Sequence, residues 1–337
     1  MRKARVRFID WDVEFIDRDL GIKQVEELAE RGTYPVHVIY GPEGCGKTAF
    51  LKQATEILRE HGYSVVHVNP MEGGEGRLGI TDELRELLKD TLAITPLAPA
   101  SALIDMAVRI LYEALRRRLT RRIALLADDV FQAVGLDRAE LLVKGFLNMI
   151  EHPQEPYERI VVLVASSEGL TRERIGRHSW AVLRMLWNMP MDGFKELYDL
   201  IPNPKPPFDY AWRWTGGNPR YLGQLYRAGW DVNHVINRII KYKELDVAIR
   251  SLSQGQRQLL ARAVEDPDVL YAEVREAQPL IDWLMERNLV IRVWDRNLDW
   301  VDTPPPEKDL ELGIGRDFAW QTPIHREAVK RVLGILT

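Results

Sequence analysis

The chain has 337 residues, of which 46% are hydrophobic and 28% charged, and its formal net charge is −4 at neutral pH. A chain of this length can bury a large core, and it predicts two or three domains. The slightly negative charge argues against a protein that coats nucleic acid through a basic surface. The single cysteine, Cys45, excludes a disulfide framework and a structural zinc site, which fits a reducing cytoplasm.

The first residues, MRKARVRFIDWD, are basic, but no apolar run follows them, so we expect no signal peptide. No uncharged apolar stretch approaches the ~20 residues that a membrane helix needs. We therefore expect a soluble, cytoplasmic protein without a membrane partner.

The first motif along the chain lies in residues 36–62, VHVIYGPEGCGKTAFLKQATEILREHG. It matches the phosphate-binding pattern Gly-x-x-x-x-Gly-Lys-Thr. The β-branched run VHVIY is typical of a buried parallel strand, and the apolar residues after the motif recur at helical spacing up to a capping glycine, Gly62. A strand, a glycine-rich loop and a helix thus follow in the order that a phosphate-binding loop (P-loop) requires, which favours this interpretation over a chance glycine-rich turn.

The P-loop residues have expected roles. The glycines allow backbone N–H groups to surround phosphate oxygens at a helix N-terminus. Lys47 is expected to reach the β- and γ-phosphates, and Thr48 to bind Mg²⁺. Cys45 is interpreted as a small loop residue rather than a redox switch. The expected nucleotide contacts of the loop are Gly41, Pro42, Glu43, Gly44, Cys45, Gly46, Lys47, Thr48 and Ala49.

Apolar runs alternate with helical patterns, which predicts βαβ units and a parallel sheet covered by helices. The four expected strands are 36–40, 63–69, 123–127 and 160–165, with 180–189 as a candidate fifth. Between the second and third strands, MEGGEGRLG is interpreted as a mobile loop, and ITDELRELLKDTLA and SALIDMAVRILYEALRRRL as amphipathic helices. The arginines that end the second helix either complement its C-terminus or form a patch for an acidic partner.

The third run, RRIALLADDVF, ends in Asp128 and Asp129. We expect its strand beside the P-loop strand, where Asp128 would order the Mg²⁺ water shell and Asp129 would orient the attacking water. The alternative is a strand that ends in a solvated acidic turn.

The fourth run, RIVVLVASSEG, ends in Ser166 and Ser167. These serines are placed to bind the γ-phosphate or the attacking water, although serines also simply end strands. The following TRERIGRHSW contains several arginines, and we select Arg174 or Arg177 to stabilise transition-state charge, in cis or in trans. A solvated basic helix is the alternative.

From Asp192 onward the strand pattern stops, and helical segments interrupted by a proline-rich turn predict a small bundle. From about Leu245, two helices, two strands and a closing helix suggest a winged helix-turn-helix. The predicted fold class is therefore α/β: a P-loop NTPase sheet (1–190), a helical lid (191–244) and a winged-helix domain (245–337).

The segment 245–337 holds 12 Lys and Arg against 16 Asp and Glu, a net charge of 12 − 16 = −4. Phosphate contact needs local positive charge. In the expected recognition helix, PLIDWLMERN, Asp282 and Glu286 accompany Arg287. The acidic balance favours a protein-facing or regulatory domain, with DNA as the alternative partner.

The segments FIDRD, GPEGCGKT, LLADD, VASSEG and TGGNPRYL together resemble the archaeal ATPase family, in the AAA+ and STAND branch of P-loop ATPases. The resemblance runs from Phe15 to the closing helix and is most specific in the P-loop and in Gly217-Asn218-Pro219. It implies a nucleotide domain, a helical lid and a winged helix, as in origin-recognition-type initiators.

The resemblance also implies site residues and a nucleotide. It implies that Phe15, Asp17 and Arg18 lie near the adenine and ribose, and that the lid contributes Pro219 and a sensor, Arg220. ATP rather than GTP, with Mg²⁺, rests on this resemblance.

At the second acidic position the family usually has glutamate, and Asp129 is one methylene shorter. This departure favours a slow ATPase that acts as a switch on a protein partner or through self-assembly. A DNA-binding replication or repair factor is the alternative function. A small-molecule kinase is disfavoured, because no substrate-phosphate lid follows the P-loop.

Overall fold

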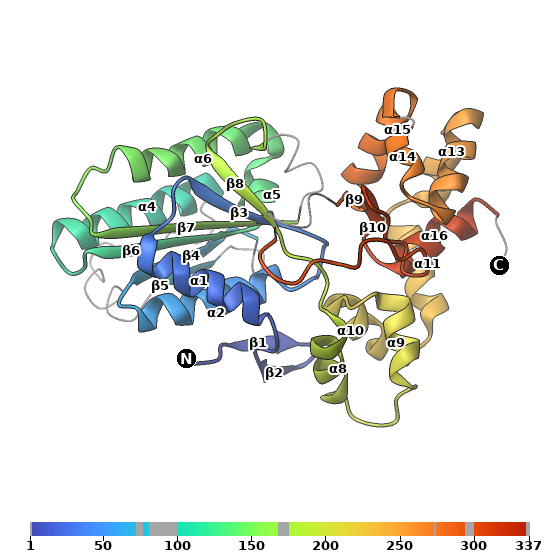
Figure 1. Cartoon of the computed structure of the whole chain (residues 1–337), viewed down its shortest axis with the longest axis horizontal. Helices are drawn as coiled ribbons and strands as arrows, with labels where there is room; N and C mark the ends of the chain where they lie inside the picture. Colours follow the sequence, from blue (N-terminus) through green and yellow to red (C-terminus); the bar gives the residue numbers. More distant parts are fainter. Residues whose placement is uncertain are drawn as a thin grey trace.

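The computed structural model describes residues 2–71, 77–80, 100–167, 175–272, 274–293 and 300–334. Its largest sheet has the strand order β5-β4-β6-β7-β3-β8 (Figure 1). These strands are β3 (Val36–Tyr40), β4 (Ser64–Asn69), β5 (Arg77–Ile80), β6 (Arg122–Asp128), β7 (Arg159–Ser166) and β8 (Ala181–Met185). All neighbours pair in parallel except β5, which lies antiparallel to β4 at the edge. The predicted α/β fold with a parallel sheet is thus confirmed.

Two expectations about this sheet are wrong. The last three residues of the stretch interpreted as a mobile loop belong to β5, because pairing with β4 holds a glycine-containing segment that has little strand propensity of its own, whereas residues 72–76 lie outside the described residues. The strand that ends in Asp128 is not beside the P-loop strand, because β7 lies between β6 and β3. Both errors concern which strands pair, and that depends on residues distant in sequence. The helix expected in ITDELRELLKDTLA falls almost entirely outside the described residues.

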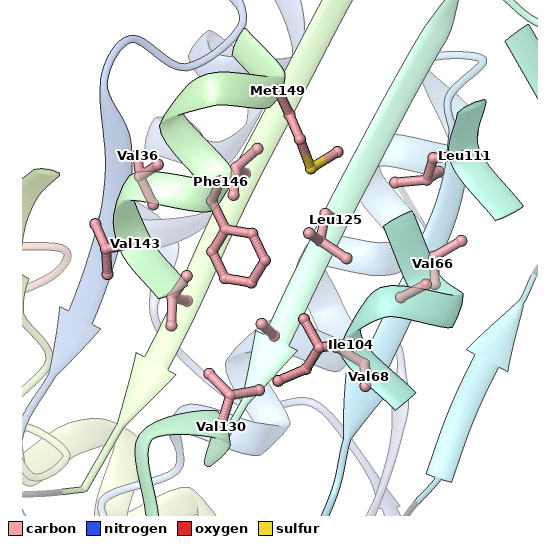
Figure 2. Packing of buried hydrophobic residues seen from close by; sticks show 14 of the residues in the cluster. Val36, Val66, Val68, Ile104, Leu111, Leu125, Val130, Val143, Phe146 and Met149 are labelled. Atoms are coloured by element: carbon pink, nitrogen blue, oxygen red, sulfur yellow. The ribbon is translucent and has the colours of Figure 1, made fainter. Parts of the chain in front are cut away.

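Helices cover both faces of the sheet. One face carries α1 (Asp19–Arg31) and α2 (Lys47–Glu60), and the other carries α4 (Ala100–Arg116), α5 (Val130–Val134) and α6 (Leu136–Glu151). Alternate strand residues enter the two layers, so Val38 packs with the second group of helices and Ile39 with the first. Figure 2 shows the second layer, where Phe146 and Met149 of α6 contact the strand residue Leu125.

A short hairpin precedes the sheet. It consists of β1 (Arg5–Phe8) and β2 (Trp11–Glu14), which the sequence patterns did not predict. Phe8 and Val13 share a buried cluster with Phe194 and Leu197 of α8, so the hairpin lies against the helical bundle (Figure 1). The N-terminal residues therefore join the nucleotide-domain sheet to the following helices.

The helical bundle expected after Asp192 is present. It comprises α8 (Met191–Asp199), α9 (Phe208–Thr215), α10 (Pro219–Arg227) and α11 (Val232–Tyr242). The Asn218 side chain accepts the Tyr221 N–H and caps α10, and Pro219 occupies the first turn. The sequence Asn-Pro thus fixes where α10 begins.

The C-terminal part contains helices and a two-stranded antiparallel ribbon. The elements are α12 (Leu245–Arg250), α13 (Gln254–Glu265), α14 (Val269–Ala272), α15 (Val274–Glu286), β9 (Val290–Arg292), β10 (Phe318–Trp320) and α16 (Pro323–Val332). One hydrophobic cluster runs from α10 and α11 through these helices. The elements match the expected order of helices and strands, whereas the winged-helix assignment and the boundary at 245 stay predictions.

The connection between β9 and β10 returns to the nucleotide domain. Trp300 forms a bridge with Met185 of β8, and the Gln24 amide of α1 donates to the carbonyls of Trp300 and Val301, at 3.0 and 2.8 Å. The C-terminal part is thereby attached to the edge of the sheet near the P-loop.

The α6 layer provides a test of the core. Replacing Phe146, which is 2% exposed, with alanine should lower the free energy of unfolding by about 3–5 kcal/mol, through lost burial and a cavity. Leu141→Ala is the matched control, since that side chain is 71% exposed on the same helix and should change stability by about 0.5 kcal/mol or less. Urea denaturation measures both, and equal losses would contradict the packing described for α6.

Candidate functional site

The P-loop connects β3 to α2 in the predicted way. Gly44 and Gly46 have φ of 81° and 107°, in the left-handed region that favours glycine. A Cβ on Gly41 would lie 2.0 Å from the Leu186 carbonyl oxygen, so the loop passes that backbone too closely for any other residue. Since α2 begins at Lys47, its first N–H groups have no intrahelical acceptor and are directed toward the loop.

The Lys47 side chain is 5% exposed and lies within the loop. Its ammonium donates to the carbonyl oxygens of Gly41 and Pro42, at 2.9 and 2.8 Å. Thr48 follows in the first turn of α2 and is half-buried. The loop's own backbone thus holds a buried cation at the position expected to bind phosphate.

The two acids lie at the carboxyl end of β6. Asp128 is buried and accepts a hydrogen bond from the Asn69 amide at 3.2 Å. Burial raises the pKa of Asp129, the adjacent Asp128 carboxylate raises it further, and the Lys47 and Arg220 cations oppose this shift. Ser167 donates to Asp129 at 3.5 Å. Lys47 and the acids therefore share one electrostatic environment.

Asn69 is a site residue that the sequence analysis missed. It ends β4, the neighbour of β6, so its amide lies at the same edge of the sheet as Asp128. The available signal was a polar residue at the carboxyl end of a predicted strand.

Ser166 ends β7 between the P-loop strand and the acidic strand. In the β3–β7 register it is opposite Tyr40, the last strand residue before the loop, and it is buried. The serine strand β7 therefore lies beside the P-loop strand, the position that the sequence analysis expected for the acidic strand β6. Its contact with a γ-phosphate stays a prediction.

The helical bundle contacts the P-loop directly. The Asn218 side-chain amide donates to the Glu43 backbone carbonyl at 3.0 Å. The backbone N–H of Arg220 donates to the Gly44 carbonyl at 3.3 Å. The Arg220 guanidinium also forms an ion pair with the Glu43 carboxylate. Pro219 begins α10 between these two contacts. The structure thus brings Pro219 and Arg220 to the loop, whereas their roles in a lid and as a sensor stay predictions.

The three N-terminal residues that the resemblance placed near the adenine and ribose, Phe15, Asp17 and Arg18, lie in three different environments. Phe15 is buried in the cluster that contains Phe50. Burial raises the pKa of Asp17, whose Oδ2 has no hydrogen-bond partner among the described residues. Arg18 is buried behind the loop and donates to the carbonyls of Cys45 and Trp187, at 3.0 and 2.8 Å. Arg18 therefore supports the loop from within, and the adenine contact of the trio stays a prediction.

The arginine candidates are less well placed. Arg174 lies outside the described residues, and Arg177 is exposed in the turn before β8. A contribution from either to catalysis stays a prediction.

The residues gathered here fit a magnesium–nucleotide complex. A buried lysine and a helix N-terminus favour phosphate oxygens. A threonine hydroxyl and a buried carboxylate, Thr48 and Asp128, are the hard oxygen donors that Mg²⁺ prefers. Within the part of the chain that the structure describes, no helix is long and apolar enough to cross a membrane.

Comparisons with known proteins show the family of the chain and similar folds. A family model described as an ATPase domain predominantly from Archaea matches residues 15–225. The Walker-type ATPase of Pyrococcus abyssi is similar in fold, with a TM-score of 0.50, 13% identity, and coverage of 94% of this chain and 96% of that one. Cdc6p from Pyrobaculum aerophilum matches at a TM-score of 0.40, with 14% identity and 94% coverage of each chain. The Aeropyrum pernix ORC2 protein matches at 0.41, with 12% identity and coverage of 93% and 94%. No match was found among curated proteins.

Lys47→Ala tests the phosphate role of the loop. Removing the ammonium should weaken binding of Mg²⁺-ATP by about tenfold to a hundredfold or more, because a charge-assisted contact is lost, while the fold stays intact. Isothermal titration calorimetry measures the affinity, with Lys52→Ala on the same helix as the matched control. Normal affinity in Lys47→Ala would contradict the assignment.

Proposed function

The chain belongs to the family of ATPase domains found predominantly in Archaea, and from this membership we propose that it works as a slow, ATP-dependent conformational switch. As a member of this family it is a P-loop ATPase. The observation that carries the proposal is the contact between lid and loop: Asn218 and Arg220 both bind Glu43, a residue of the P-loop itself. A ligand in this loop acts directly on residues that position the lid.

The proposed site uses the residues at the carboxyl edge of the sheet. Lys47 binds the β- and γ-phosphates, Asp129 orients the attacking water, and Ser166 binds the γ-phosphate. Thr48 and Asp128 hold Mg²⁺, which when bound would neutralise charge on the phosphates. Asn69 keeps the Asp128 carboxylate in place through its amide.

Two properties of Asp129 favour slow turnover. Its side chain is one methylene shorter than glutamate, so it reaches less far toward an attacking water. Its raised pKa, caused by burial and by the Asp128 charge, disfavours the ionised form that accepts a proton. Slow hydrolysis prolongs the ATP-bound state, as a switch requires.

In the proposed switch, phosphate oxygens of the nucleotide compete with groups of the loop for two cations, Lys47 and Arg220. Lys47 is bonded to carbonyls of the loop, and Arg220 to the Glu43 carboxylate. Phosphate oxygens attract both cations, and Arg220 can turn to them only by releasing Glu43. The α10 helix moves with Arg220, so the free energy of nucleotide binding shifts the lid. The bundle (191–244) and the C-terminal domain (245–337) then transmit the change.

The partner we propose is a protein or a second copy of the chain. The net charge of −4 over residues 245–337 disfavours duplex DNA, the alternative partner, since DNA binding relies on positive charge near phosphates. DNA binding would appear as retardation at low salt and would weaken steeply as salt is added.

Asp129→Glu tests the origin of slow turnover. The longer carboxylate should raise kcat between about threefold and a hundredfold, since small improvements in alignment have large effects on rate. Phosphate release at saturating ATP measures kcat, and Asp129→Asn, which should lose turnover while still binding ATP, is the control. If Asp129→Glu is no faster than the unaltered protein, the length of this side chain does not limit hydrolysis.

Light scattering after size-exclusion chromatography tests the switch. We expect a defined assembly with Mg²⁺ and a non-hydrolysable ATP analogue, and a smaller species with ADP, because only the triphosphate competes fully for Lys47 and Arg220. Glu43→Gln, which weakens the ion pair to Arg220, should reduce the difference between the two nucleotides. A monomer under every condition would exclude self-assembly and leave a separate protein as the partner.

A further inference from the structure

The backbone N–H and the backbone carbonyl of Glu43 both form hydrogen bonds with side chains that are distant in sequence. Its carbonyl accepts from Asn218 of the lid, and its N–H donates to the Gln321 side-chain Oε1, at 3.0 and 2.8 Å. Gln321 directly follows β10 and precedes α16. The C-terminal part of the chain therefore contacts the P-loop through one amide side chain.

The orientation of that amide is determined by its partner. The Glu43 backbone N–H is a donor, so it must face the amide oxygen, and the Gln321 NH₂ group must point elsewhere. Gln321 is 0% exposed, and its Nε2 finds no hydrogen-bond partner among the described residues. Buried donors are normally satisfied, so a buried unpaired NH₂ beside a P-loop indicates an acceptor supplied by a ligand.

The position of Gln321 is fixed by a ring of amides. The Asn188 amide donates to the Gln321 carbonyl at 3.0 Å, and its oxygen accepts from Asn218 at 2.8 Å. Asn218 in turn binds the Glu43 carbonyl, which closes the ring. Asn188 is 3% exposed, and Asn218 and Gln321 are fully buried. Such a ring holds the Gln321 side chain in a defined place beside the P-loop.

Glu43 lies beside the cation that is expected to bind the terminal phosphates. The Lys47 ammonium, which is assigned to the β- and γ-phosphates, donates to the carbonyls of Gly41 and Pro42, directly before Glu43 in the loop. Arg220, whose guanidinium forms an ion pair with Glu43, is a second cation at this part of the loop. A donor beside Glu43 lies toward the terminal phosphate of a nucleotide bound along the loop.

We propose that Gln321 is a phosphate-binding residue supplied by the C-terminal part of the chain, and that its Nε2 donates to the terminal phosphate of ATP. The proposal rests on the proposed ATPase function and names the residue by which the C-terminal domain distinguishes ATP from ADP. ADP lacks the acceptor and leaves the NH₂ unpaired. ATP satisfies it and ties the segment between β10 and α16 to the P-loop.

Gln321→Glu is the most direct test. Glutamate keeps an oxygen for the Glu43 N–H, replaces the donor with an acceptor and adds a charge that repels phosphate. We expect affinity for a non-hydrolysable ATP analogue to fall by about tenfold or more, and affinity for ADP to change by less than about threefold. Isothermal titration calorimetry with Mg²⁺ measures both, and thermal melting without nucleotide checks the fold.

Asn188→Ala is a companion variant, because it opens the amide ring that positions Gln321 but leaves the Gln321 donor in the chain. It should weaken binding of the ATP analogue more than binding of ADP, but by less than Gln321→Glu does. Equal effects of Gln321→Glu on ADP and the ATP analogue, or no effect, would overturn the proposal. If the unaltered protein bound neither nucleotide, the proposed function itself would fail, so the two failures are distinguishable.

Hydrogen exchange of the unaltered protein tests the proposal without any substitution. The ATP analogue should add protection to peptides that cover residues 318–325, and ADP should add less. Equal protection by the two nucleotides would overturn the role of Gln321 even if both of the variants failed to fold.

Discussion

The nucleotide site depends on one buried ion pair, between Arg18 and Asp302. The two side chains are 3.1 Å apart and each is 3% exposed, although they are separated by 284 residues. Arg18 also donates to the carbonyls of Cys45 in the P-loop and Trp187 beyond β8. Loss of one partner from such a pair leaves a buried charge, at a cost of about 3–5 kcal/mol. One guanidinium thus fixes the loop, the exit from the sheet and the returning C-terminal segment together.

The local part of the site could be predicted from the sequence, and its surroundings could not. The P-loop is a local feature, because strand, glycines and helix follow one another within residues 36–62, and all three were found. The carboxyl-edge positions of Asp128 and Ser166 also follow from short apolar runs. The order of strands does not, since pairing depends on both faces of every strand at once, and β7 accordingly lies where β6 was expected. Asn69 was missed for the same reason, as only pairing brings β4 beside β6.

The helical bundle and the C-terminal part show where a family resemblance helps and where it stops. The resemblance predicts that Gly217-Asn218-Pro219 lies near the nucleotide site, and Asn218 does contact the P-loop. No pattern indicates that Gln321 binds the Glu43 N–H, because a lone glutamine after a strand is unremarkable by itself. The same holds for Asp302, a single acid in a polar connection. Contacts across about 280 residues can be recognised only when the fold has brought the partners together.

The returning connection between β9 and β10 also bears on how the protein folds. In this connection, Asp302 forms the ion pair with Arg18, and the Trp300 carbonyl accepts from Gln24. Just after β10, Gln321 accepts the Glu43 N–H. Closing such long segments of chain costs conformational entropy before their contacts form, which slows folding. During synthesis the P-loop leaves the ribosome long before these residues do. A nascent chain therefore contains the phosphate-binding motif before Asp302 and Gln321 are available to contact Arg18 and Glu43.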